Sequence, residues 1–290
     1  MLKNENEIVK EMQNRYRIAA REVEKEINTL LDNYAGRNGL SLADVKGEVS
    51  ATDIRDYEDK AKKYVKEKNF SPKANREMAR YNLKMKISRL ELLKSHIDLE
   101  LIALADEMER EILEYLIEVG TGEAKRQAGI LAESVSIGTA AVEQIAKRKF
   151  HDSDFSNRIW RNKALLHREL KDRLIEQITK GQNPRKAARI MRETIEQSVY
   201  NTERIMRTES SRVQTEVQME SFKKAGFEEY EFITTEGACE ICEPLDGKIF
   251  KVKDYQPGNN ASPMHPHCRC STAAYMDREE WDKKLKEKGL

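Results

Sequence analysis

The chain has 290 residues, of which 36% are charged and 39% hydrophobic. This length allows two domains, but the small apolar share predicts thin helical packing and not one large core. With 52 Lys and Arg against 51 Asp and Glu, the formal net charge is +1, which argues against an overall field that attracts DNA or anionic lipid. We find no window of about 18 uncharged apolar residues and no apolar signal core, so neither a membrane partner nor classical secretion is expected.

The N-terminal half is predicted to be helical. Residues 5–34 carry apolar side chains at spacings of three and four, which indicates one helix with a buried stripe. Ser41 and Asp44 have the form of a capping box, and a charged helix is expected near 52–68.

A single long helix is predicted next. It begins at Pro72, and no further proline and no glycine occur up to about Val119. We expect Gly120 and Gly122 to end the helix. Such a helix cannot bury itself, so residues 1–150 are predicted to form an elongated helical region that packs as a bundle or docks on another protein.

The second predicted domain covers residues 151–290, after a linker at 150–156. It opens with helices that begin at Asn157 and at Pro184, where a cap residue or a first-turn proline favours a helix start. The helix that ends at Gly226 carries an acidic residue on its apolar face.

That residue is Glu209. Its carboxylate needs hydrogen-bond donors, because burying it unpaired would cost on the order of several kcal/mol of folding free energy. Arg212, Arg207 or Arg204 could supply them. We interpret the group as a structural polar network tying this helix to the cysteine segment; a catalytic acid is the alternative, but no nucleophile or base lies nearby in the sequence.

After Gly226 the periodicity becomes that of strands. Tyr230–Thr235 is a predicted strand, and Leu245–Val252 contains an Asp-Gly turn followed by alternating apolar residues, which indicates a β-hairpin. A short helix is expected from Met276 to Lys288. The predicted fold class is mainly α with a small α+β C-terminal module, made of a β-hairpin and a zinc-knuckle-like segment.

All four cysteines and two of the histidines gather within this module. They are Cys239, Cys242, His265, His267, Cys268 and Cys270. Paired thiolates of this kind are typical of tetrahedral Zn²⁺ sites, because each short pair can bind one ion from a single turn of backbone. A redox or disulfide CxxC motif and free structural thiols are the alternatives; a reducing cytoplasm and the lack of a βαβ pattern disfavour the redox interpretation.

A structural zinc ion is therefore the predicted cofactor. The expected ligands are the four thiolates of Cys239, Cys242, Cys268 and Cys270, with His265 replacing one of the second pair as the alternative. The spacing departs from the commonest pattern, since 25 residues separate Cys242 from Cys268 where many such modules have about 15 to 20. If His265 is not a ligand, it would hydrogen-bond a thiolate or a carbonyl. His267 is expected to be exposed.

The order of these motifs resembles a known family. Arg207-Thr-Glu209 in a helix, Gly226 before a strand, Cys239-x-x-Cys242, Leu245-Asp-Gly-Lys248 and His265-Pro-His-Cys-Arg-Cys270 are similar to the tailed-phage head morphogenesis family, the Mu F-like minor head proteins. The resemblance covers about residues 157–275.

This resemblance implies a non-enzymatic minor capsid protein. Such a protein is made in the bacterial host cytoplasm, assembles with the portal and with capsid or scaffold proteins, and lies inside the virion head near the portal vertex. It also implies that some relatives touch packaged double-stranded DNA.

Two other functions are weighed against it. A DNA-binding module would use the basic side chains of Lys147, Arg148, Lys149, Arg185 and Lys186 on phosphates, with affinity that falls steeply with salt. A zinc hydrolase would need an open metal position and a general base.

Overall fold

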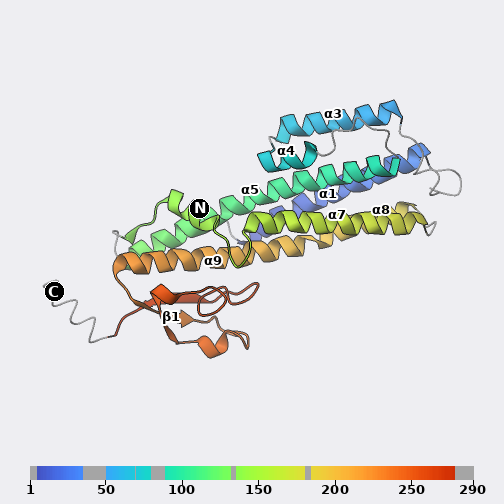
Figure 1. Ribbon diagram of the computed structural model, residues 1–290. Helices are drawn as coiled ribbons and strands as arrows, with labels where there is room; N and C mark the ends of the chain where they lie inside the picture. The colour runs from blue at the N-terminus through green and yellow to red at the C-terminus, as the bar shows by residue number, and fades with distance from the viewer. Residues whose placement is uncertain are drawn as a thin grey trace. The chain divides into compact units, whose positions relative to one another are not determined.

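The computed structural model describes residues 5–34, 50–68, 70–79, 89–131, 135–179 and 184–277. The helices are α1 (Glu5–Tyr34), α3 (Ala51–Lys68), α4 (Pro72–Ala79), α5 (Arg89–Leu131), α6 (Thr139–Ala146), α7 (Phe155–Thr179), α8 (Pro184–Gln197) and α9 (Val199–Ala225) (Figure 1). The strands are β1 (Glu229–Ile233), β2 (Ile249–Lys251) and β3 (Ser271–Tyr275), with 3-10 turns η2 (Glu243–Leu245) and η3 (Val252–Asp254). The predicted class, mainly α with a small α+β module near the C-terminal end, is confirmed.

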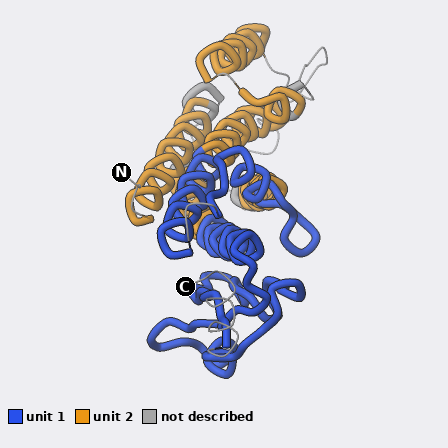
Figure 2. The backbone as a smooth tube through the Cα atoms, turned by 90° about the vertical axis from the view of Figure 1, so that its left-hand side faces the viewer, with its two compact units in different colours: residues 1–3, 111–155, 204–290 blue, residues 4–110, 156–203 orange. Residues whose placement is uncertain are grey.

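The chain divides into two compact units, coloured separately in Figure 2. Residues 1–3, 111–155 and 204–290 form the first, here called the sheet unit, and residues 4–110 and 156–203 form the second, the bundle unit. Each unit therefore draws residues from both sides of position 150. The division into domains 1–150 and 151–290 stays a prediction.

In the bundle unit, the predicted stripe of α1 is buried. Met12, Ala20 and Val23 are fully buried, because their spacing places them on one helical face. This face packs against α8, and Arg192 of α8 forms an ion pair with Glu24 of α1 at 3.2 Å.

Helix α3 begins with a capping box formed by Ser50 and Asp53. The Asp53 backbone N–H donates to Ser50 Oγ at 3.1 Å, and the Ser50 N–H donates to the Asp53 carboxylate at 3.2 Å. Tyr57 of α3 packs with Leu92 and Leu99 of α5 in a small apolar cluster. The expected capping box at 41–44 lies outside the described residues.

Helix α5 corrects the prediction that Gly120 and Gly122 end a helix. The helix continues to Leu131. A Cβ on Gly120 would lie 2.5 Å from Val142 Cγ1 and 2.8 Å from Val213 Cγ1, so this glycine permits close approach of α6 and α9. Residues 80–88, between α4 and α5, lie outside the described part, so one unbroken helix from Pro72 stays untested.

The sheet unit contains an antiparallel sheet with strand order β2-β1-β3. Tyr230 pairs with Phe250 of β2, and Phe232 pairs with Thr272 of β3. Tyr230 is fully buried and packs with Met219 and Phe222 of α9, which places the core of this unit between sheet and helix.

Sequence analysis missed two elements of this unit, α6 and β3. The sequence of β3, STAAY, has few β-branched or aromatic residues, so pairing with β1 decides its conformation and local propensity does not. The predicted Asp-Gly turn precedes β2, where Gly247 has a φ of 69°, and the hairpin partner of β2 is β1. The helix expected at 276–288 falls largely outside the described residues.

Within the described ranges, no helix has both the length and the apolar character required to cross a lipid bilayer.

Candidate metal centre

Two loops of the sheet unit bring the cysteines together. The first leaves β1 and turns at Cys239–Cys242 before η2, and the second runs from His265 to Cys270 and leads directly into β3. Because β1 pairs with both β2 and β3, the sheet holds the ends of these two loops side by side. Cys239 is exposed, whereas Cys242, Cys268 and Cys270 are buried.

The ligand atoms form two overlapping groups of three that share Cys242. One group is Cys239, Cys242 and His265; the other is Cys242, Cys268 and Cys270, and within each group the atoms lie within 4.8 Å of one another. His265 Nε2 lies 3.1 Å from Cys239 Sγ and 3.3 Å from Cys242 Sγ. This cluster can hold a metal ion.

The thiols have unequal proton affinities. Backbone N–H groups of Cys242 and Ile241 lower the pKa of Cys239, whereas burial, together with the nearby charge of Cys268, raises the pKa of Cys242. Burial likewise raises the pKa of Cys270. Burial acts to raise the pKa of Cys268 too, but hydrogen bonds from Ser262 and from backbone groups lower it overall.

Closely packed thiolates repel one another in a buried site, so ionisation of several of them requires a compensating cation. A soft or borderline divalent ion meets this requirement, because it binds thiolate directly and removes the proton. Four such donors fill a tetrahedral shell and leave no position for a reacting water, which suits a structural role.

Polar side chains of α9 support the second loop, and sequence analysis missed them. Ser262 Oγ lies 3.4 Å from Cys268 Sγ and 2.7 Å from Ser211 Oγ of α9. The His267 backbone N–H donates to Thr208 Oγ1 at 3.3 Å. The available signal was the recurrence of small hydroxyl residues along α9, which share a face at a spacing of three.

His267 corrects a prediction. Expected to be exposed, it is half-buried, because its turn packs on α9 through Thr208. Its ring belongs to neither of the two ligand groups among the described residues.

The Glu209 network is buried in the sheet unit. Arg212 is fully buried and donates to Glu209 Oε2 at 2.6 Å and to Glu216 Oε1. Its other contacts are the carbonyls of Ile145 at 3.1 Å and Ala146 at 3.0 Å, at the end of α6. The guanidinium thus joins α9 to α6, and the tie from this network to the cysteine segment stays a prediction. Arg207 lies half-buried on the same helix.

The basic candidates for DNA contact lie in both units. Lys147 and Lys149 are exposed after α6, where Lys147 pairs with Glu143. Arg148 pairs with Glu216 at 3.0 Å and with Glu220 at 3.7 Å. These pairings reduce the positive potential of this stretch.

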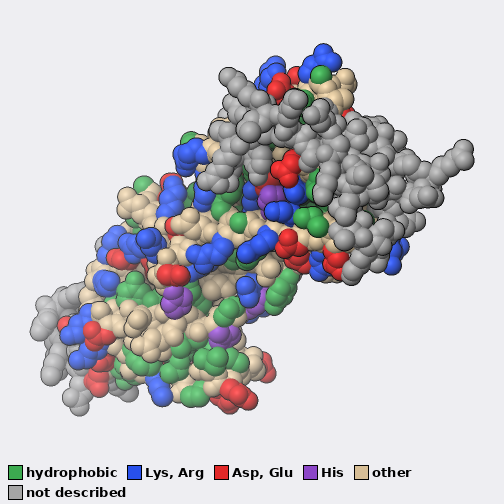
Figure 3. Space-filling model, turned by 45° about the vertical axis from the view of Figure 1, so that its right-hand side comes forward, with side chains coloured by type: hydrophobic (Ala, Val, Ile, Leu, Met, Phe, Trp, Pro, Cys, Tyr) green, Lys and Arg blue, Asp and Glu red, His purple; other side chains and the backbone are tan. Residues whose placement is uncertain are grey.

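The other two basic candidates belong to α8 of the bundle unit. Lys186 is exposed, and the side chain of Arg185 lies outside the described residues. On the face shown in Figure 3, basic and acidic side chains are intermingled, in keeping with the near-zero net charge.

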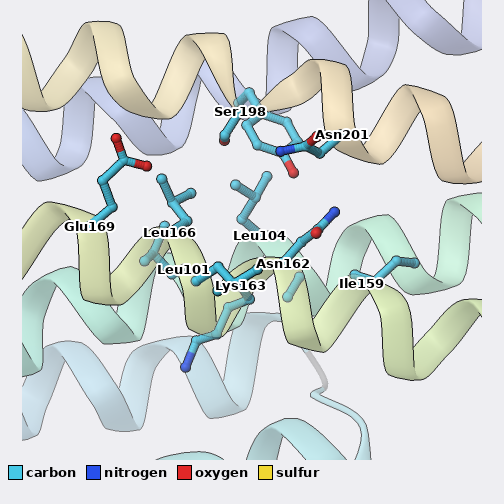
Figure 4. A pocket seen from close by; sticks show the side chains of 12 residues that line it. Leu101, Leu104, Ile159, Asn162, Lys163, Leu166, Glu169, Ser198 and Asn201 are labelled. Carbon is cyan, nitrogen blue, oxygen red and sulfur yellow. The ribbon is translucent and has the colours of Figure 1, made fainter.

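A pocket lies within the bundle unit. Figure 4 shows leucines of α5 and α7, with Asn162 and Asn201, around the same space. Tyr16 of α1 also lines it and hydrogen-bonds Thr202 at 2.5 Å. The described lining contains no cysteine or histidine, so it offers packing and amide contacts and lacks the soft ligands of the cysteine cluster.

Comparison with known proteins identifies the segment that carries the cluster. Residues 168–273 match the family described as Phage Mu protein F like protein. The chain carries a phage Mu F-like segment. The match includes Glu209, Arg212 and all five residues of the two ligand groups, and it confirms the resemblance found in the motifs. No curated protein and no solved structure matches the chain.

Proposed function

We propose that this protein is a non-enzymatic minor component of a phage head, incorporated near the portal vertex during assembly. The observation that carries the proposal is the Mu F-like segment at 168–273, which suggests head morphogenesis and encloses the complete cysteine cluster. Its partners on this proposal are the portal protein and capsid or scaffold proteins, and its place is the virion.

The bound metal in this proposal is a structural zinc ion. Thiolate and imidazole donors are those that zinc prefers, and the ion would reinforce the small apolar cluster that joins the two loops around Phe232. Elemental analysis of protein purified without chelators should give one zinc per chain. If the protein contains no zinc after this purification and adding zinc leaves its stability unchanged, the proposal of a structural zinc ion is overturned.

Assembly can be tested by co-expressing the chain with the portal and capsid proteins of the same phage. We expect it in purified particles that contain the portal, and not in particles made without the portal. A chain that stays out of portal-containing particles at every salt concentration contradicts the proposal. A particle lacking only a tail component is a suitable control, because it retains the portal.

Contact with packaged DNA is proposed as a secondary property, because Lys147 and Lys149 are exposed. A double variant Lys147→Ala/Lys149→Ala should bind duplex DNA more weakly and with a smaller dependence on salt, since each lost phosphate contact reduces the slope. Equal slopes for variant and wild type would contradict it.

A further inference from the structure

The two loops of the metal cluster contain matched turns. Two residues separate Cys239 from Cys242, and the Cys242 N–H donates to the Cys239 carbonyl at 2.9 Å. Two residues also separate His265 from Cys268, and the Cys268 N–H donates to the His265 carbonyl at 3.1 Å. His265-x-x-Cys268 is therefore the structural counterpart of Cys239-x-x-Cys242, whereas Cys270 lies beyond the turn, next to β3.

The ring of His265 is oriented as a ligand. Its Nδ1 lies 2.8 Å from the Pro266 carbonyl, which can only accept, so Nδ1 carries the proton. The lone pair on Nε2 then faces Cys239 Sγ and Cys242 Sγ, 3.1 and 3.3 Å away.

Three separations, from His265 Nε2 to Cys239 Sγ and Cys242 Sγ and from Cys242 Sγ to Cys268 Sγ, are near those around a tetrahedral ion. With metal–sulfur bonds of about 2.3 Å and metal–nitrogen bonds of about 2.0 Å, the edges of the tetrahedron are about 3.5 to 3.8 Å. Cys242 Sγ and Cys268 Sγ lie 3.9 Å apart, close to such an edge. The hydrogen bonds of Ser262 and Thr208 hold the second turn against α9 in this position.

We propose that Cys239, Cys242, His265 and Cys268 bind the ion, and that Cys270 stays outside its coordination sphere. This replaces the four-thiolate set expected from sequence spacing and rests on the metal site of the proposed function. Cys270 Sγ lies within 4.8 Å of Cys242 Sγ and Cys268 Sγ and packs with them in the small apolar cluster around Phe232, so its exclusion rests on its place beyond the turn. The full ligand set is then one CxxC turn and one HxxC turn.

Cobalt(II) binding to the full chain tests the assignment, because thiolate ligands give charge-transfer absorption in proportion to their number. We expect Cys270→Ala to retain the wild-type affinity and absorption. Cys268→Ala should lose about a third of the charge-transfer intensity, since two of three thiolates remain. His265→Ala should keep that intensity but bind cobalt more than about tenfold more weakly.

Loss of charge-transfer intensity in Cys270→Ala, or unchanged cobalt binding by His265→Ala, overturns the assignment. X-ray absorption of the zinc-loaded wild type gives a second measurement that needs no variant. Three sulfur donors and one nitrogen donor support the proposal, and four sulfur donors overturn it. A wild type that binds neither metal would instead refute the structural zinc itself.

Discussion

Arg212 shows how one residue can decide the packing of two helices. Its guanidinium is fully buried between the carboxylates of Glu209 and Glu216 and also donates to two carbonyls at the end of α6. These carbonyls are the negative end of a helix, where a cation is stabilising. A planar group with five donors can make all of these contacts, which a lysine cannot.

Replacing Arg212 with methionine should therefore destabilise the fold strongly. Two carboxylates would lose the guanidinium between them, at a cost of about 3–5 kcal/mol in the free energy of unfolding. The matched control is Arg148→Met, which removes a half-exposed partner of the same Glu216 and should cost less than about 1 kcal/mol. Urea unfolding of both variants measures the difference, and equal losses would contradict the role given to Arg212.

His267 holds a backbone conformation that favours glycine. Its φ is 63°, in the left-handed region, within the turn that presents Cys268. We predict that His267→Gly is more stable than His267→Ala by about 1 kcal/mol, because both variants lose the ring and only alanine retains the Cβ penalty. Thermal unfolding of the zinc-loaded variants measures this difference. If the alanine variant is at least as stable as the glycine variant, the turn has changed its backbone conformation to avoid the penalty.

At the scale of elements, α5 shows that glycine in a helix has two opposite meanings. Gly120 is buried where α5 approaches Val142 of α6 and Val213 of α9. Gly129 of the same helix is exposed, and a Cβ added there would meet no described atom of another segment within 4 Å. Helix propensity alone treats both positions alike. The packing around the two glycines differs, and this difference decides what a side chain would do at each position.

Alanine substitutions at these two positions should therefore have opposite signs. Gly129→Ala should stabilise the protein by up to about 1 kcal/mol, through higher helix propensity. Gly120→Ala should destabilise it by about 1–3 kcal/mol, because the added methyl group overpacks the crossing. The measurement is the melting temperature of each variant. A stabilising Gly120→Ala would mean that the neighbouring valines move away without cost.

At the scale of the whole molecule, stability comes from two different sources. The helices bury long apolar stripes such as that of α1. The segment between β1 and β3 has a much smaller apolar cluster, in which Cys242, Cys268 and Cys270 surround Phe232. A metal ion would compensate for the small core, because binding energy at a site absent from the unfolded chain adds to folding energy.

Metal removal should consequently affect one part of the chain more than the rest. After treatment with a strong chelator, we expect most of the helical circular dichroism to persist while trypsin cleaves faster at Lys251 and Arg269, which are exposed residues of the sheet unit. Returning zinc should restore protection. Identical cleavage with and without chelator would show that no metal stabilises this segment.

Much of the fold follows from patterns within single elements. The stripe of α1, the end of α9 near Gly226 and the strand at β1 were predicted correctly, because each depends on the spacing of apolar residues along its own backbone. The gathering of thiols in one segment also predicted a cluster able to bind metal, and the order of the motifs identified the phage Mu F-like segment.

The sequence by itself thus determined the mainly helical class, the phage Mu F-like segment and the residues from which a metal site can be built. Only the tertiary structure decided that α5 passes Gly120, that β3 pairs with β1, and that an HxxC turn matches the CxxC turn. These features depend on contacts between residues far apart in the chain. Local periodicity cannot encode them, since a helix crossing or a shared metal ligand is defined by where two segments meet.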